Sequence, residues 1–187
     1  GEVGSQVRLT VQRQGRDDPF DLEMVCEPLP GTVPELAVHD VHVDSDGAIW
    51  LGLVDGEILR YQVKANTWRL FTSEDGLVMG WRPRIDQTRD GSIWTVYNAT
   101  RAGVNHFDGE RWHHHTVPGN TDDNTTLFAL SDGSLLVSGI VDLSRFHNGV
   151  WTSYRHEPLA RPKTRIAQFL ESKDGDIWVA ALGGEAY

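Results

Sequence analysis

The stretch DSDGAIWLG, residues 44–52, combines an Asp-Gly pair with a tryptophan three residues after the glycine, and the chain repeats this pattern. TRDGSIWTV (88–96) and SKDGDIWVA (172–180) keep the whole pattern, whereas LSDGSLLVS (130–138) has Leu136 in place of the tryptophan. The turn glycines lie 44, 42 and 42 residues apart and are Gly47, Gly91, Gly133 and Gly175. A period of about 40 to 45 residues indicates structural units that stack on one another.

Each period contains four segments with the pattern of short β-strands. The second strand carries the tryptophan, the third carries an aromatic residue (Tyr61, Phe107 or Phe146), and the fourth opens with another tryptophan. Asp-Gly between alternating apolar runs is a strong hairpin signal, because glycine tolerates the positive φ that such a turn requires. No segment shows a sustained helical period of apolar residues. The sequence therefore predicts an all-β chain built from four-stranded β-propeller blades.

The repeated tryptophans Trp50, Trp94 and Trp178 are expected to fill the space between neighbouring blades. The last period ends at Tyr187 inside its expected third strand, and propellers close with about four to eight blades. We therefore expect an incomplete propeller of about three and a half blades, with further blades and domains in the same polypeptide. The expected blades span 38–83, 84–124, 125–164 and, in part, 165–187.

Composition narrows the function classes. The 187 residues are 39% hydrophobic and include seven tryptophans, enough to build a core. The formal net charge of −10 argues against a nucleic-acid partner, which requires a basic face. Cys26 is the single cysteine, so no internal disulfide can form. No apolar run approaches the roughly 18 to 20 residues needed to span a bilayer, so we expect no membrane contact by this segment.

The segment DSDGAIWLGLVDGEILRYQVKANTWRLFTSEDGL (44–77) resembles the two-component regulator propeller repeats in the sensor regions of hybrid histidine kinases. That pattern runs roughly D-x-D-G-x-I-W-x-G-T, G-L-x-R-Y/F, W-x-x-Y/F-T and E-D-G-L, and the resemblance covers about residues 38–187. The third period lacks the tryptophan, and the second and third lack E-D-G-L, which weakens the transfer of a particular ligand site. The resemblance implies a periplasmic or extracellular sensing part of a larger bacterial signalling protein.

The N-terminal stretch GEVGSQVRLTVQRQGRDDPFDLEMV (1–25) lies outside the repeat. It resembles the last two strands of a bacterial protease-type PDZ domain, whose pattern runs G-x-x-G-S-x-V-x-L-T-V-x-R-x-G. We expect a PDZ hairpin remnant over 1–27 and a linker over 28–37. This resemblance implies an alternative function, an accessory PDZ-propeller segment of a secreted or periplasmic serine protease that presents substrate.

Two clusters of polar residues suit metal ions only in part. Asp44 and Asp46 gather oxygen atoms at the first turn, but Ca²⁺ needs about six to eight oxygen ligands, and the other copies begin with Arg or Lys. His113 and His115 share one face of a strand, and zinc would require a third ligand such as His106. We interpret the first cluster as a hairpin turn and the second as a polar blade edge, and expect no metal and no cofactor.

The sequence offers no arrangement for nucleophilic catalysis. It contains no G-x-S-x-G, and nothing presents a Ser-His-Asp arrangement. We therefore expect a chain that is not an enzyme, but a propeller that binds a ligand or acts as a scaffold. Propeller lyases with similar D-G-x-x-W repeats are a third interpretation, which requires a catalytic His or Tyr in the channel and would be tested at His115 and His156.

The loops at one mouth of the expected channel carry the candidate binding site. They join the outer strand of one blade to the inner strand of the next, over 72–84, 116–124 and 155–165. Arginine suits carboxylate or sulfate groups, and an aromatic face suits a sugar ring. We expect a small anionic or glycan ligand here; the alternative is that these are solvated charges that balance nearby acids. The candidate residues are Trp81, Arg82, Arg84, Arg161, Lys163 and Arg165.

Overall fold

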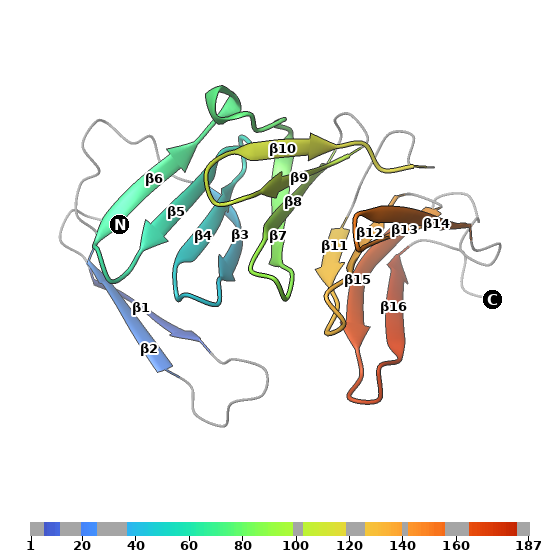
Figure 1. Cartoon of the computed structure of the whole chain (residues 1–187). Helices are drawn as coiled ribbons and strands as arrows, with labels where there is room; N and C mark the ends of the chain where they lie inside the picture. Colours follow the sequence, from blue (N-terminus) through green and yellow to red (C-terminus); the bar gives the residue numbers. More distant parts are fainter. Residues whose placement is uncertain are drawn as a thin grey trace. The chain divides into compact units, whose positions relative to one another are not determined.

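The computed structural model describes residues 6–11, 20–25, 37–98, 103–118, 126–139, 142–155 and 165–182 (Figure 1). These residues form sixteen β-strands and one short 3₁₀ helix, Ser73–Asp75. The chain divides into two compact units, residues 1–36 and 37–187.

The first unit contains one antiparallel hairpin. Strand β1 (Gln6–Val11) pairs with β2 (Phe20–Val25), with Gln6 opposite Val25 and Val11 opposite Phe20. The hairpin agrees with the two strands expected from the alternating apolar residues of this stretch. Most of the expected linker, up to residue 36, lies outside the described residues.

The second unit contains four antiparallel sheets whose strands pair in chain order. The first sheet holds β3 (Val38–Val43), β4 (Ile49–Leu53), β5 (Ile58–Gln62) and β6 (Thr67–Phe71). The second holds β7 (Trp81–Gln87), β8 (Ile93–Asn98), β9 (Val104–Phe107) and β10 (Trp112–His115). The third holds β11 (Thr126–Ala129), β12 (Leu135–Ser138), β13 (Asp142–His147) and β14 (Val150–Arg155). The fourth holds β15 (Arg165–Glu171) and β16 (Ile177–Leu182).

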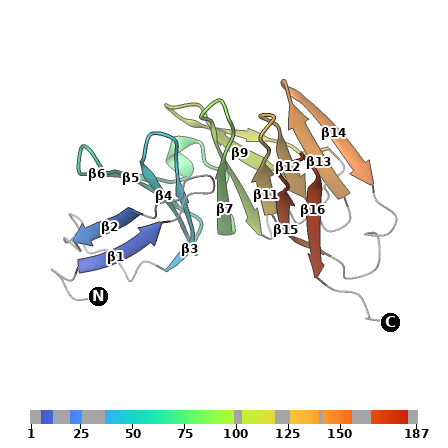
Figure 2. The same cartoon turned by 90° about the horizontal axis from the view of Figure 1, so that it is seen from below.

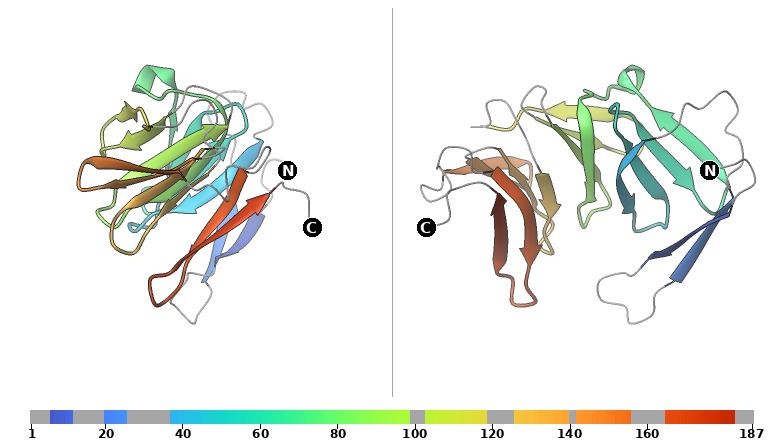
Figure 3. Two further views of the ribbon diagram at one scale, coloured as in Figure 1. Left: turned by 90° about the vertical axis from the view of Figure 1, so that its right-hand side faces the viewer. Right: turned by 180° about the vertical axis from the view of Figure 1, so that it is seen from behind.

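Successive sheets of the second unit meet through their first strands. Strand β7 contacts both β3 and β11, and β11 contacts β15. Figure 2 shows these strands in that order, and Figure 3 gives two further views of the fold. The first strand is therefore the inner edge of each sheet, and β6, β10 and β14 are the outer edges. This arrangement is an incomplete β-propeller, as the sequence predicted.

The Asp-Gly turns have the backbone conformation that the repeat predicted. The φ angles of the four turn glycines are +84°, +89°, +86° and +85°, a region that favours glycine because it has no Cβ. In the first turn the N–H of Gly47 donates to the carbonyl of Asp44 at 3.0 Å, and the N–H of Gly91 donates to Thr88 at 2.9 Å. The same turn therefore opens every sheet of the second unit.

Tryptophans and inter-sheet hydrogen bonds join the sheets. Trp50 and Trp94 are 1% and 3% exposed and lie in apolar clusters formed by adjacent sheets. Near the inner edge, the Asp40 carboxylate accepts a hydrogen bond from the N–H of Ile85 at 2.8 Å. The Asp86 carboxylate accepts one from the N–H of Ala129 at the same distance. Each sheet is thus fixed to the next by both apolar packing and a hydrogen bond.

Trp178 differs from the other two repeated tryptophans. Its side chain is 65% exposed, so it does not fill an inter-sheet space as the sequence predicted. The cause is the absence of a covering surface: Trp50 is covered by Phe107 of the next sheet, and no described residue holds that place beside Trp178. Leu136, which replaces tryptophan in the third sheet, is buried as expected.

Candidate functional site

Three of the predicted loop-face residues gather at the start of β7. Trp81 is 69% exposed, and Arg82 and Arg84 are also exposed. A β-bulge separates Trp81 from Arg84 and leaves Arg82 at φ +53°, an uncommon conformation for a residue other than glycine. The Arg82 N–H donates to the carbonyl of Val54 at 3.2 Å. Because β7 is an inner strand that starts at the end opposite the Asp-Gly turn, these side chains lie at the loop end of the channel.

The other predicted site residues are not brought to this position by the described structure. Arg161 and Lys163 lie outside the described residues. Arg165 is the first residue of β15, and only its backbone is described. The structure therefore places half of the predicted set in one location.

His39 belongs to the same location and was not among the predicted residues. Burial, together with the positive charges of Arg84 and Arg82, lowers the pKa of His39, while the Asp40 carboxylate opposes this shift. Strand β3 contacts β7, and both guanidinium groups act on His39, so the two strands contribute to one charged cluster. When the first two repeats are aligned by their turn glycines, His39 matches the start of β7. This alignment is the sequence signal that could have identified His39 as part of the site.

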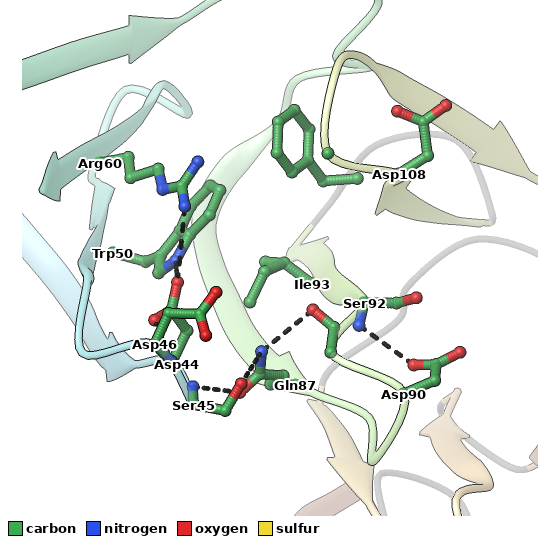
Figure 4. Close-up of a pocket in the computed structure, with 13 residues that line it drawn as sticks. Asp44, Ser45, Asp46, Trp50, Arg60, Gln87, Asp90, Ser92, Ile93 and Asp108 are labelled. Carbon is green, nitrogen blue, oxygen red and sulfur yellow. Dashed lines mark hydrogen bonds and ion pairs between the residues drawn. The ribbon is translucent and has the colours of Figure 1, made fainter.

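The opposite end of the unit contains a cleft between the first and second sheets (Figure 4). Its volume is about 290 Å³, and its lining includes Asp44, Asp46, Arg60 and Asp108. The Asp44 carboxylate is occupied by structural contacts, because it accepts hydrogen bonds from the N–H groups of Asp46 and Ala48 at 3.0 and 2.8 Å. It also accepts the indole N–H of Trp50 at 2.8 Å. These contacts confirm the interpretation of this acidic cluster as a turn.

A second cleft of about 380 Å³ occupies the equivalent place between the second and third sheets. Thr88 stands where Asp44 stood and accepts the indole N–H of Trp94 at 3.0 Å. Its hydroxyl donates to Asp90 at 2.7 Å. Because the same cleft recurs at successive junctions, we attribute both to the spacing of the sheets and not to recognition of a ligand.

The histidine triplet is divided between two environments. His113 is partly exposed and lies 2.6 Å from the Asp108 carboxylate. His115 lies against Trp94, with ring centroids 5.4 Å apart, and burial lowers its pKa. Strand β10 is the outer edge of its sheet, so His115 does not line the channel. Among the described residues, no group of three or more His, Cys, Asp or Glu side chains could hold a metal ion. His156, the other residue singled out for a lyase, lies outside them.

Antiparallel sheets whose strands pair in chain order, and which meet through their inner strands, define this unit as a β-propeller. It is similar to the extracellular domain of BT4673 from B. thetaiotaomicron, described as a hybrid two-component system, at 16% identity and a TM-score of 0.63. That match covers 83% of this chain and 21% of the other. The BT3049 domain from the same organism matches at 16% identity, a TM-score of 0.61, and 80% and 21% coverage.

The virginiamycin B lyase of Staphylococcus aureus is similar to the same degree. Its identity is 16% and its TM-score 0.65, with 94% of this chain and 56% of the lyase covered. The chain thus spans a fifth of the sensor domains and about half of the lyase. A family model described as strictosidine synthase-like, N-terminal, matches residues 21–61. No match was found among the curated proteins.

These similarities correct two expectations. The expectation that the chain is not an enzyme depended on missing hydrolase motifs. It is wrong as an inference from the fold, because the virginiamycin B lyase is an enzyme with this fold. The comparisons give no support to a PDZ remnant, and the one family match begins inside the expected hairpin and continues into the first sheet. No helix in the described part of the chain is long and apolar enough to cross a membrane.

Proposed function

We propose that the propeller binds a small anionic ligand, such as an acidic sugar, at the loop end of its channel, and that this binding is the input of an extracellular or periplasmic sensor. Arg82 and Arg84 would hold a carboxylate or sulfate group, and the exposed Trp81 ring would cover an apolar face of the ligand. Further blades of the same polypeptide would contribute to the same mouth. The observation that carries the proposal is the conformation of Arg82.

Arg82 is held in position before any ligand arrives. Its backbone has φ +53°, its N–H is bonded to Val54, and the next residue, Pro83, is fully buried. A non-glycine residue in this region costs about 1 to 3 kcal/mol, and such residues cluster at active sites and ligand-binding sites. The backbone that carries the guanidinium group is therefore fixed before a ligand binds, which reduces the conformational entropy lost on binding.

The local charge also favours an anion. Arg82 and Arg84 lie at this end with exposed side chains, and the nearby Asp40 carboxylate is engaged by the N–H of Ile85. The cluster is thus cationic within a chain whose formal net charge is −10. Such local reversal of charge attracts anions within roughly a Debye length of about 8 to 10 Å.

The sensing role is supported by the two B. thetaiotaomicron domains, which are extracellular parts of two-component systems. Because this chain spans only 21% of each, the signalling output would reside in other parts of a longer protein. The protease alternative loses its basis, since it depended on the PDZ resemblance.

Calorimetric titration with glucuronic acid, galactose 6-sulfate and neutral galactose would test the proposal. We expect the acidic sugars to bind and Arg84→Ala to weaken their binding about 10- to 100-fold, the effect of one charge-assisted hydrogen bond of about 1.5 to 3 kcal/mol. Arg82→Gly should have a similar effect while preserving the backbone conformation. Arg69→Ala, which removes an arginine on the outer strand β6, is the matched control. Equal binding of glucuronic acid by the wild type, Arg84→Ala and Arg82→Gly would refute the assignment.

A further inference from the structure

Three of the inner strands carry a β-bulge at the same place. On β3 the extra residue is His39, which stands between Val38 and Asp40. Strands β7 and β15 show the same irregularity in their register. Bulges redirect side chains and are over-represented beside active sites. The residues at the bulge that stand eight positions before their turn glycine are His39, Pro83 and Ala167. The bulge is therefore a recurring feature of the loop end of the inner strands.

The bulges of β3 and β7 meet at Gly52 of β4. In the register of β3 and β4, Asp40 is opposite Gly52, and His39 is the extra residue beside Asp40. A Cβ added at Gly52 would lie 2.8 Å from Cγ of Pro83, so the bulge of β7 packs directly on this glycine. His39 therefore lies where the bulges of two neighbouring sheets come together.

The bulge also changes the direction that regular pairing would give the His39 side chain. In a regular strand His39 would point away from Asp40, whose carboxylate accepts the N–H of Ile85 on β7 at 2.8 Å. The bulge interrupts this alternation, because His39 and Asp40 together oppose one residue of β4. The positive charges of Arg82 and Arg84 both act on the imidazole. These observations assign His39 to the same site as the two arginines.

We propose that His39 is a third contact of the anion and takes up a proton when the anion binds. This inference rests on the proposed function, because it concerns the same ligand and the same site. The neutral imidazole gains one proton from solvent, and an N–H of the resulting imidazolium donates to an oxygen of the anion. No covalent bond of the ligand changes. Binding of the anion then strengthens as the pH falls.

The electrostatics of the free site favour this proton uptake. Burial and the positive charge of Arg84 lower the pKa of His39, with a smaller contribution from Arg82, while the Asp40 carboxylate opposes the shift. A bound anion offsets the charge of the guanidinium groups and places a negative charge beside the imidazole. Because a nearby opposite charge favours the protonated form, the anion raises the pKa of His39.

Linkage gives the sign of the pH dependence. The pKa of His39 lies below its usual 6.5 in the free protein and is higher in the complex, so the complex holds more protons between the two values. Affinity therefore rises as the pH falls through this window, by at most about tenfold per pH unit for one proton. The neighbouring turn between β4 and β5 carries Asp55 and Glu57, and neither contributes to the shift of the His39 pKa.

Calorimetric titration of the 187-residue chain with galactose 6-sulfate at pH 7.5, 6.5 and 5.5 would test this role, because the sulfate ester stays ionised throughout. Titrations in two buffers of different ionisation enthalpy measure the protons taken up. We expect uptake of up to about one proton per anion and an affinity that rises by up to about tenfold per pH unit. His39→Gln, which keeps a hydrogen-bond donor but does not titrate, should bind without proton uptake. Circular dichroism at each pH checks that the chain is folded.

The matched control is His113→Gln, which removes a partly exposed histidine on the outer strand β10 and should keep the proton uptake of the wild type. Anion binding without proton uptake, or unchanged uptake by His39→Gln, would overturn the role of His39 and leave the proposed function standing. Loss of uptake in His113→Gln would overturn it by assigning the proton to β10. Absence of anion binding by the wild type at every pH would refute the proposed function and this inference with it.

Discussion

The junction around Trp50 and the junction around Trp94 have the same architecture and different chemistry. At the first, Trp50 stacks on Phe71 with centroids 5.7 Å apart and planes at 10°, and the Arg60 guanidinium lies 4.9 Å from the indole centroid. The indole N–H donates to a carboxylate, that of Asp44. The ring is therefore surrounded by aromatic groups, one guanidinium group and one carboxylate acceptor.

At the second junction, imidazoles hold the places of Phe71 and Arg60. His106 stacks on Trp94 at 4.4 Å, and His115 lies 5.4 Å from it. In the described structure, the Nε2 atoms of both histidines are buried and have no hydrogen-bond partner. The repeat thus constrains the shape of the space between sheets, whereas the polarity of the groups that fill it varies from one junction to the next.

Truncating the two tryptophans should give the largest effects. Trp50→Ala is expected to lower the free energy of unfolding by about 3 to 5 kcal/mol, because it removes a fully buried aromatic side chain from the cluster between the sheets and leaves the Asp44 carboxylate without the indole N–H. Trp94→Ala should cost less, since water entering its cavity can bond to the unsatisfied histidine nitrogens. Urea denaturation measures both, with exposed Trp81→Ala as the control. An equal loss at both sites would show that polarity does not distinguish the junctions.

Acid should weaken the second junction more than the first. Burial lowers the pKa of both His106 and His115 below the usual 6.5, with a smaller contribution from His115 to His106 and from His113 to His115. For His106, the Asp90 and Asp108 carboxylates oppose this shift. The unfolded chain therefore binds more protons than the folded one, and stability falls as the pH drops below about 6.5 until the lowered pKa values are passed.

Exchanging side chains between the junctions tests this difference. His115→Phe, which copies Phe71, should reduce the pH dependence by up to one proton, about 1.4 kcal/mol per pH unit. Phe71→His should increase it by the same reasoning. Unfolding in urea at pH 7.5, 6.0 and 5.0 gives the slopes. If His115→Phe leaves the slope unchanged, the acid sensitivity arises elsewhere.

The sequence predicted the fold more completely than the site. Asp-Gly turns and recurring tryptophans are local signals that determine backbone conformation and burial directly, so strands, turns and sheet order could be predicted. The site depends on which loops meet, and the influence of Arg84 on the pKa of His39 follows from sheet register and not from local pattern. Trp178 shows the same limit, because burial depends on a neighbouring surface that its own sequence does not specify.

The smallest expected effect concerns the turns that the two junctions share. Gly47 and Gly91 have φ +84° and +89°, and a Cβ added at Gly47 would meet nothing within 4 Å, while at Gly91 the nearest atom is Gln87 Nε2 at 3.9 Å. Alanine at either position should therefore cost only the conformational penalty of about 1 to 2 kcal/mol. Urea denaturation of Gly47→Ala and Gly91→Ala should give losses that agree within about 0.5 kcal/mol. Equal losses would assign the difference between the junctions to the side chains between the sheets, whereas unequal losses would place part of it in the turns.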